Sequence, residues 1–170
     1  MPESSVLAEV REFIDGMKRE WPELFSRRPK LAAPPPAPSR PPAALVPAPA
    51  ADAPLRAVVP EGDLAELFRL RAEHWARVLG VSFGTVRGKD QRALWGSCTR
   101  AGNLNFNWRL ALAPDCVLDY LVVHELAHRV HMDHSRRFWS FVERACPGYR
   151  AHRRWLRKNG SALYRAPRPR

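Results

Sequence analysis

The chain has 170 residues, with 17 prolines, three cysteines and a formal net charge of +11. This length suffices for one ordinary domain with attachments but not for two full domains. The sequence contains no apolar run near the ~18 residues of a membrane span, no signal-peptide core and no tight cysteine pairing, so we expect a cytoplasmic protein and neither a membrane-spanning nor a disulfide-framework one.

Three regions of different composition precede the C-terminus. Residues 29–61 are dominated by Pro and Ala, which offer too little apolar surface to fold and are typical of a semi-rigid linker. Before them, residues 1–28 repeat apolar side chains at three- and four-residue steps, which predicts an amphipathic helix. The linker leads into a body over residues 62–160, followed by a basic tail over 161–170. We expect 62–160 to fold as the domain, with few contacts to the linker.

Periodicity and turn residues predict the secondary structure of the body. The expected elements, in order, are a helix over 63–79, strands in 81–87 and 92–95, a hairpin turn at 100–103, a half-buried strand over 104–110, an apolar helix over 116–130, a helix over 136–145 and a basic helix over 149–158 that ends at Asn159-Gly160. A helix, a short antiparallel sheet and then further helices indicate an α+β domain.

The positive charge is concentrated in the body and tail. Residues 1–61 carry eight basic and eight acidic side chains, whereas residues 62–160 carry 17 basic and nine acidic ones. The two last predicted helices should turn their apolar positions inward and these basic residues outward: Arg136, Arg137, Arg144, Arg150, Arg153, Arg154, Arg157 and Lys158. Such a surface favours nucleic acid or an acidic substrate over a membrane, and its alternative is a solvated face that only aids solubility.

The segment His124-Glu125-Leu126-Ala127-His128 carries the chemistry. Residues four apart on a helix share one face, so His124 and His128 can bind the same metal ion. Glu125 lies about 100° round the helix, where its carboxylate can reach a metal-bound water without being a ligand. Because the helix is otherwise apolar, these polar groups would be costly to bury without a shared role. The spacing therefore predicts metal-assisted hydrolysis.

A catalytic zinc normally has three protein ligands and a water. His131 and His134 are the candidates for the third ligand. His131 follows His128 by only three residues and stays near the same face if the helix continues, whereas His134 is far enough along for the chain to turn and approach from another side. Tetrahedral coordination needs that second direction, so we predict His134.

Other residues allow two interpretations. Asn105 and Asn107 are either ordinary polar residues of an exposed strand or part of an edge that hydrogen-bonds an extended substrate. Cys98 could approach the metal, but a buried, inert thiol is expected because three histidines already satisfy the ion. His74 and His152 have no partners at ligand spacing and are expected on the surface.

Several motifs in this order resemble the YgjP-like metallopeptidase family, which is related to the SprT-like and WLM zinc proteases. They are Trp95-Gly96-Ser97-Cys98, the segment from Gly102 to Leu110, the segment from Asp119 to His128, Asp133-His134-Ser135 and Phe138-Trp139. The resemblance covers about residues 62–160 and implies a compact zincin-type domain. It also implies that zinc is held by His124, His128 and His134, in agreement with the geometric argument.

We therefore expect a metallopeptidase that holds one Zn²⁺ per chain and hydrolyses peptide bonds with Glu125 activating the zinc-bound water. One alternative is a zinc-dependent hydrolase of nucleotides or other phosphoanhydrides. The sequence argues against it, because it contains neither a Gly-rich phosphate loop nor a carboxylate cluster that could hold a second metal ion. The other is a nucleic-acid-associated module with a structural zinc, which would have no need of Glu125.

Overall fold

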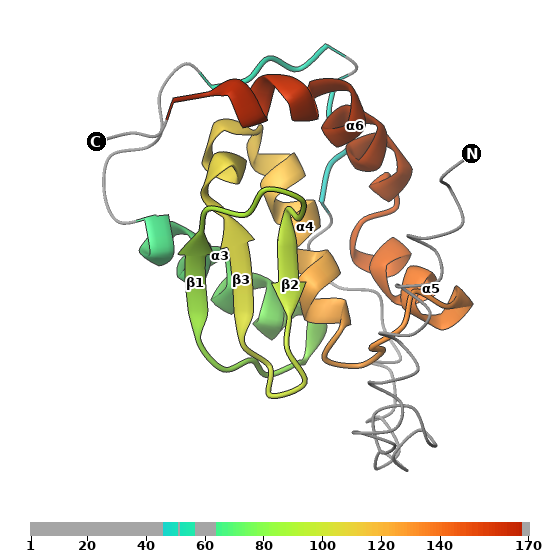
Figure 1. The fold of residues 1–170 in the computed structure, drawn as a ribbon. Coiled ribbons are helices and arrows are strands. Elements are labelled where there is room, and N and C mark those ends of the chain that lie inside the picture. The colour runs from blue at the N-terminus through green and yellow to red at the C-terminus, as the bar shows by residue number, and fades with distance from the viewer. Residues whose placement is uncertain (1–45, 51, 57–63, 168–170) are drawn as a thin grey trace, which may run out of the picture. The chain divides into compact units, whose positions relative to one another are not determined.

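The computed structural model describes residues 46–50, 52–56 and 64–167 (Figure 1). The predicted helix over residues 1–28 lies outside them. The elements are α3 (Leu64–Leu79), β1 (Val86–Lys89), β2 (Gly96–Cys98), β3 (Leu104–Asn107), the 3-10 helix η1 (Trp108–Leu112), α4 (Asp115–Ala127), α5 (Arg136–Ala145) and α6 (Tyr149–Arg165). A small sheet combined with helices confirms the predicted α+β class.

The three strands form a mixed sheet in the order β1-β3-β2. β2 and β3 form the predicted antiparallel hairpin, in which Gly96 lies opposite Phe106 and Gly102 adopts a positive φ of 88° in the turn. β1, however, runs parallel to β3, with Val86 opposite Leu104, so the expectation of a purely antiparallel sheet is wrong at this pair. The chain crosses to the far side of β3 before the hairpin begins, and local alternation carries no information about that crossover.

All three strands are shorter than predicted, and the first two also start later. β1 begins at Val86, within the strand predicted over 81–87, and β2 begins at Gly96, just after the strand predicted over 92–95, whereas β3 begins at Leu104 as predicted. β3 ends at Asn107 because the Asn107 side chain accepts a hydrogen bond from the backbone N–H of Arg109 and starts η1. The apolar alternation beyond Asn107 therefore belongs to a 3-10 helix, whose buried side chains continue the core.

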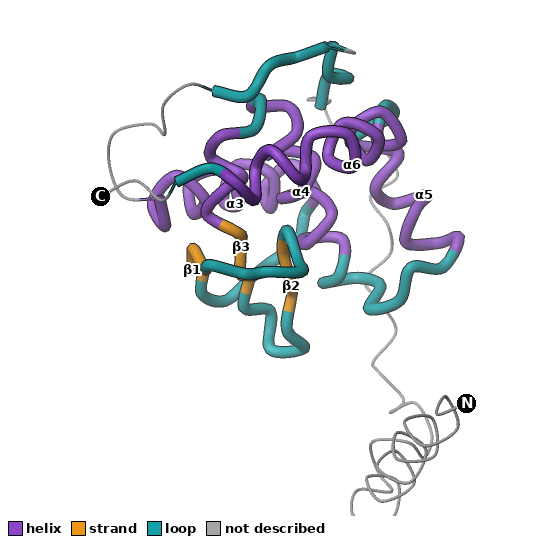
Figure 2. The backbone as a smooth tube through the Cα atoms, turned by 45° about the horizontal axis from the view of Figure 1, so that its top comes forward, coloured by secondary structure: helices purple, strands orange, loops and turns teal. Residues whose placement is uncertain are grey.

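Helix α4 is the centre of the domain. It packs against α3, β2, α5 and α6, and nine of its 13 residues are buried. On one side of it, α3 and the sheet meet where the rings of Phe68 and Phe106 lie 5.3 Å apart. Figure 2 shows the strands in one layer with the helices gathered on the other side. Any polar group on α4 thus needs a partner supplied by a neighbouring element.

Helix α6 continues beyond its predicted end at Asn159-Gly160 and reaches Arg165. Leu163 is completely buried, and the ring of Tyr164 lies 4.8 Å from that of Trp95. Gly160 lies so close to Trp95 that an added Cβ would be 3.3 Å from the indole. Tertiary packing against Trp95 therefore outweighs the local tendency of Asn-Gly to end a helix, and the first residues of the predicted tail belong to the domain.

Part of the predicted linker is packed on the domain. We call residues 46–50 and 52–56 the strap. It runs alongside α6 (Figure 1), and Val46 is only 2% exposed. Three hydrogen bonds of 2.8 Å tie it down: from the Val46 N–H to the Ala145 carbonyl, from the Trp155 indole N–H to the Ala53 carbonyl, and from the Arg56 N–H to the Leu112 carbonyl. The expectation of few contacts with the linker is wrong for these residues, because isolated Val and Leu side chains and free backbone groups in a Pro/Ala stretch suffice for docking.

Replacing Val46 by Ala should lower the free energy of unfolding of the full chain by roughly 1–3 kcal/mol, because it removes buried methyl groups and leaves a cavity. Leu70→Ala is the matched control: Leu70 is 52% exposed on α3, so its truncation should change stability by less than about 0.5 kcal/mol. Urea unfolding of both variants measures the difference. Equal stabilities of Val46→Ala and wild type would show that the strap adds nothing to the fold.

Candidate metal centre

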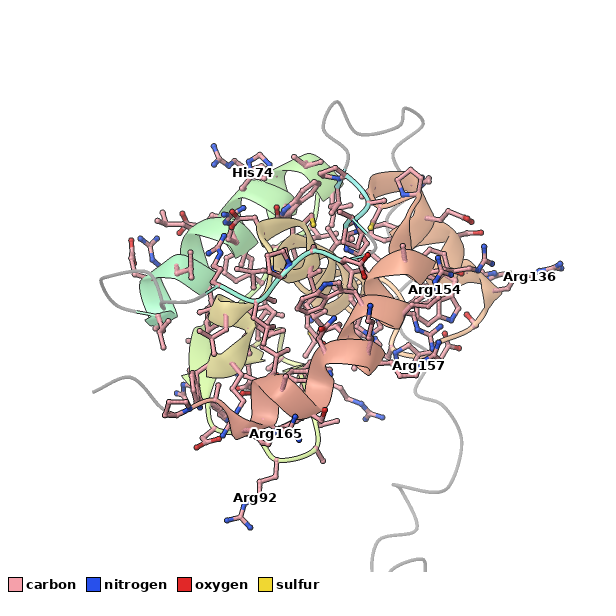
Figure 3. The ribbon with its side chains drawn as sticks, turned by 90° about the horizontal axis from the view of Figure 1, so that it is seen from above. His74, Arg92, Arg136, Arg154, Arg157 and Arg165 are labelled. Atoms are coloured by element: carbon pink, nitrogen blue, oxygen red, sulfur yellow. The ribbon has the colours of Figure 1, made fainter. Side chains whose placement is uncertain are left out.

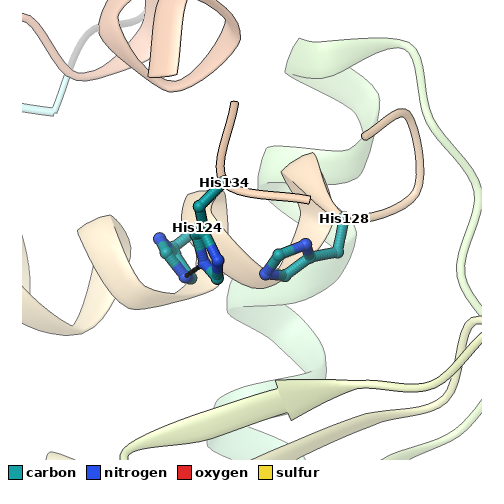
Figure 4. Close-up of side chains that lie close together, drawn as sticks. All are labelled: His124, His128 and His134. Carbon is teal, nitrogen blue, oxygen red and sulfur yellow. Dashed lines mark hydrogen bonds between the residues drawn. The ribbon is translucent and has the colours of Figure 1, made fainter. Parts of the chain in front are cut away.

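Three histidine side chains converge at one end of α4 (Figure 4). His124 and His128 lie one turn apart on the helix, and the chain after α4 turns back so that His134 approaches them from the loop before α5. The Nε2 atoms of His124 and His134 are 3.2 Å apart, and one ring nitrogen of each histidine lies within 4.8 Å of the other two. The structure thus brings together the three predicted ligands.

The ring of His128 is oriented by the neighbouring loop. Its Nδ1 lies 3.0 Å from the backbone carbonyl oxygen of His131, so Nδ1 carries the proton and donates it, while Nε2 keeps its lone pair for the cluster. The carbonyl can reach this atom because α4 ends at Ala127, with His128 as its C-terminal cap, and the following residues form turns. The side chain of His131 does not join the cluster and lies instead against Phe141. His131 therefore contributes through its backbone, a role that no sequence pattern signals.

Burial keeps two of the rings neutral. Burial, together with the nearby His128 and His134, lowers the pKa of His124 to about 3. Burial also lowers the pKa of His128, although the hydrogen bond to the His131 carbonyl opposes the shift. Only the neutral imidazole can donate a lone pair to a metal ion. At neutral pH both rings are therefore competent ligands.

Phe138 supports the cluster from α5. Its ring is fully buried, and its centroid lies 4.9, 4.7 and 4.7 Å from the ring centroids of His124, His128 and His134, respectively. Packing of all three imidazoles on one aromatic ring limits their rotation, so the geometry of the cluster depends on how α5 docks on α4. The sequence signal for this role was the position of Phe138 on the apolar face of the predicted helix over 136–145.

Glu125 is buried between α4 and the start of β2, with an exposed fraction of 4%. It can lie there because residue 96 is a glycine: a Cβ at Gly96 would be only 2.6 Å from Oε1 of Glu125. Burial raises the pKa of the Glu125 carboxyl to about 8. A carboxyl that is this costly to ionise gains its charge most easily beside a cation. The need for glycine at position 96 is a site feature that sequence reasoning missed.

The nitrogen atoms of the three histidines form a donor set suited to a metal ion. Two nitrogen lone pairs that face each other at 3.2 Å repel unless a proton or a cation lies between them, and Nδ1 of His124 is buried with no hydrogen-bond partner among the described residues. Three imidazoles form a donor set that suits zinc and its neighbours in the transition series. His134 is exposed, so the cluster is open to solvent on its side. These residues fit a metal ion with an accessible coordination position.

Asn105 and Asn107 do not form an edge for substrate. β3 is the central strand, and both side chains are buried. Asn105 donates to the hydroxyl of Ser97 at 3.1 Å, and Asn107 donates to the carbonyls of Gln91 and Leu94 at 2.7 and 3.1 Å. They hold the neighbouring strand and loop in place, so the interpretation as substrate ligands is wrong. The strand next to Glu125 that lies at the sheet edge is β2.

Two other sequence expectations have different outcomes. Cys98 is partly buried, its thiol donates to the Thr99 carbonyl, and burial raises its pKa, as expected of an unreactive thiol. His152 was expected on the surface but is fully buried, with its ring stacked on Tyr120 at 5.3 Å. A lone histidine in a basic helix gives no sign that its face will be covered, whereas here the strap and α4 cover it.

The basic residues of α5 and α6 point outward. Phe138, Val142, Trp155 and Leu156 are buried, as predicted from the periodicity, and Figure 3 shows Arg154 and Arg157 on the outer side of α6. Some of the charge is compensated, because Arg150 lies 3.9 Å from Glu143 and Lys158 lies 2.9 Å from Asp52. Binding of nucleic acid to this surface stays a prediction.

A helical pair of histidines, a third histidine from the next loop and a buried glutamate between them define a metallohydrolase site. The chain belongs to the YgjP-like metallopeptidase family, whose sequence profile matches residues 59–159. The crystal structure of the metallopeptidase zymogen abylysin from Pyrococcus abyssi is similar over 54% of this chain and 93% of that one, with 26% identity and a TM-score of 0.48. No curated protein shows significant similarity to this chain.

Family membership makes the protein a metallohydrolase with a peptide or protein substrate and confirms the resemblance inferred from the motifs. Among the described residues, no helix combines the length and the apolar character needed to cross a membrane.

The free energy of unfolding of the metal-free protein should fall as the pH is lowered from 6.5 to 4. Burial lowers the pKa of His152 to about 4, below the ordinary value of 6.5, so the unfolded chain takes up this proton first and acid favours unfolding. The loss is at most about 1.4 kcal/mol per pH unit for one histidine. His152→Phe keeps an aromatic ring on Tyr120 and cannot be protonated, so its stability should fall less steeply. Urea unfolding in EDTA at several pH values gives both slopes, and equal slopes would contradict the prediction.

Proposed function

We propose that the chain is a zinc-dependent metallopeptidase in which His124, His128 and His134 hold one zinc ion and Glu125 is the general base. The observation that carries the proposal is the convergence of three ring nitrogens within 4.8 Å of one another beside the buried carboxyl of Glu125. In tetrahedral coordination with Zn–N bonds of about 2.0–2.1 Å, two nitrogens lie roughly 3.3 Å apart. The separation of 3.2 Å between His124 and His134 is consistent with that geometry.

When bound, the ion lowers the pKa of a coordinated water toward neutrality and polarises the scissile carbonyl. Glu125 then accepts the proton of the attacking water and delivers it to the leaving nitrogen. Its raised pKa in the metal-free protein suits this cycle, since a nearby divalent cation favours the charged carboxylate while burial keeps the protonated form accessible. The hydrogen bond to the His131 carbonyl fixes the tautomer of His128, and packing on Phe138 restricts rotation of the three imidazole rings.

The position of β2 suggests how a peptide lies in the site. Among the described residues β2 pairs with β3 on one side and with no strand on the other, and Gly96 at its start lies against Glu125. An extended peptide that adds to the other side of β2 would pass alongside Glu125, with backbone hydrogen bonds supplying affinity independent of sequence. Incubation of the zinc-loaded protein with an unfolded protein and with a nucleotide panel separates peptide hydrolysis from phosphoanhydride hydrolysis, and cleavage of nucleotides alone would contradict the proposal.

The wild-type chain should bind one zinc ion, as measured by elemental analysis after reconstitution at neutral pH. His134→Ala removes one of three donors and should weaken binding by more than the roughly 10- to 100-fold caused by loss of a supporting hydrogen bond to a ligand. His131→Ala should bind zinc nearly as well as wild type, since only its backbone carbonyl supports His128. Competition with a chromogenic chelator measures both affinities. Loss of zinc from His131→Ala but not from His134→Ala would reverse the assignment.

Glu125→Gln should retain zinc and lose hydrolysis by a factor of roughly 10²–10⁴, because glutamine matches glutamate in shape but cannot accept the proton of the water. The measurement is kcat on a peptide that the wild type cleaves, alongside metal content. Glu66→Gln, an exposed glutamate on α3, is the matched control and should hydrolyse as fast as wild type. Unchanged kcat in Glu125→Gln would exclude Glu125 as the base.

A further inference from the structure

An arginine stands beside the histidine cluster on an aromatic support. The guanidinium carbon of Arg153, on α6, lies 4.8 Å from the ring centroid of Trp139, on α5. The Trp139 ring in turn lies 5.7 Å from the ring of His124 and 5.8 Å from that of His134. Trp139 also stacks on Tyr149, with a distance of 4.9 Å between the ring centroids and an angle of 18° between the ring planes. The two helices that follow the cluster therefore place a positive charge next to it.

Arg153 is held but not neutralised. Its side chain is exposed, and in the part of the chain that the structure describes it makes no ion pair with a carboxylate. The neighbouring basic residues Arg150 and Lys158 each have an acidic partner, so Arg153 differs from them. Stacking on Trp139 restricts the guanidinium without using its N–H donors, which remain available to a ligand.

This charge does not help to hold the metal ion. A guanidinium near a cation site repels the cation, and the Arg153 charge also contributes to the low pKa of His124. Nor is Arg153 part of the core, because its side chain is exposed. An exposed, unpaired guanidinium at this place is suited to bind an anion that arrives with the substrate.

We propose that Arg153 is a specificity-determining residue that binds a carboxylate of the peptide substrate next to the scissile bond. The carboxylate belongs either to an Asp or Glu side chain or to the C-terminus of the peptide, since both offer the two oxygens that a guanidinium binds in a bidentate manner. The inference rests on the proposed peptidase function and adds the chemical class of substrate that the site prefers.

The test compares matched peptides on the zinc-loaded full chain. One pair differs only by Asp or Asn at a position flanking the cleaved bond, and a second pair differs only by a free or amidated C-terminus. A charged hydrogen bond contributes about 1.5–3 kcal/mol, so wild type should prefer one carboxylate peptide by roughly 10- to 100-fold in kcat/KM. The pair that shows the preference identifies the source of the carboxylate.

Arg153→Ala should abolish the preference by lowering kcat/KM for the carboxylate peptide toward that for the uncharged peptide, while its zinc affinity stays equal or rises. Arg153→Lys should retain part of the preference, and Arg153→Glu should reverse it. Arg165→Ala is the matched control, because Arg165 is an exposed arginine at the far end of the same helix (Figure 3) and its loss should change nothing. A preference that survives in Arg153→Ala, or an equal loss for charged and uncharged peptides, would overturn the inference.

A second readout is independent of hydrolysis. Zinc-loaded Glu125→Gln protein should bind the carboxylate peptide more tightly than its neutral partner in calorimetric titration, and the difference should vanish in the double variant with Arg153→Ala. If wild type cleaves none of the peptides, the proposed function fails, and this titration alone decides the role of Arg153. Equal binding of both peptides by the Glu125→Gln protein would overturn it.

Discussion

The site depends on the fact that one helix is both the core of the domain and the carrier of its chemistry. α4 is covered by α3, β2, α5 and α6, so the histidines and the glutamate at its C-terminal end cannot be solvated as they would be on a surface helix. Two of them have a specific accommodation: the His131 carbonyl for His128, and the missing side chain at Gly96 for Glu125. Desolvation then keeps the His124 and His128 imidazoles unprotonated and suppresses the charge on Glu125, as burial does for any isolated ionisable group.

Burial acts in opposite senses on the two kinds of group. For His124 it favours the form that binds a metal, whereas for Glu125 it disfavours the form that accepts a proton. A divalent cation held by these histidines would remove this conflict, because it would take neutral nitrogens as ligands and stabilise the neighbouring carboxylate. In the proposed function, Glu125 would thus be ionised and ready to accept a proton when the ion is bound, whereas burial alone favours its protonated form.

The sequence predicts best what is local. The spacing of His124, Glu125 and His128 requires only helical geometry, and the helix over 136–145 has the predicted bounds, 136 and 145. The prediction of His134 as the third ligand needed one further argument, namely that tetrahedral coordination requires a ligand that approaches the metal ion from a second direction. The predictions that failed concern contacts between distant segments. They missed the parallel pairing of β1 with β3, the burial of His152 and of Asn107, and the docking of Val46. Local propensity also misplaced the end of α6, because Gly160 is adapted to the Trp95 ring rather than to a turn.

The strap has a consequence for the order in which the protein is made. Its residues leave the ribosome early, but their partners Leu112, Ala145 and Trp155 are synthesised 56 to about 100 residues later. Trp95 is likewise synthesised long before Tyr164, the residue whose ring packs on it. Contacts of such sequence separation form late and slowly. During translation, a nascent chain that already contains His124, Glu125 and His128 still lacks the elements that enclose them, so the emerging polypeptide is not yet a working hydrolase at the ribosome exit.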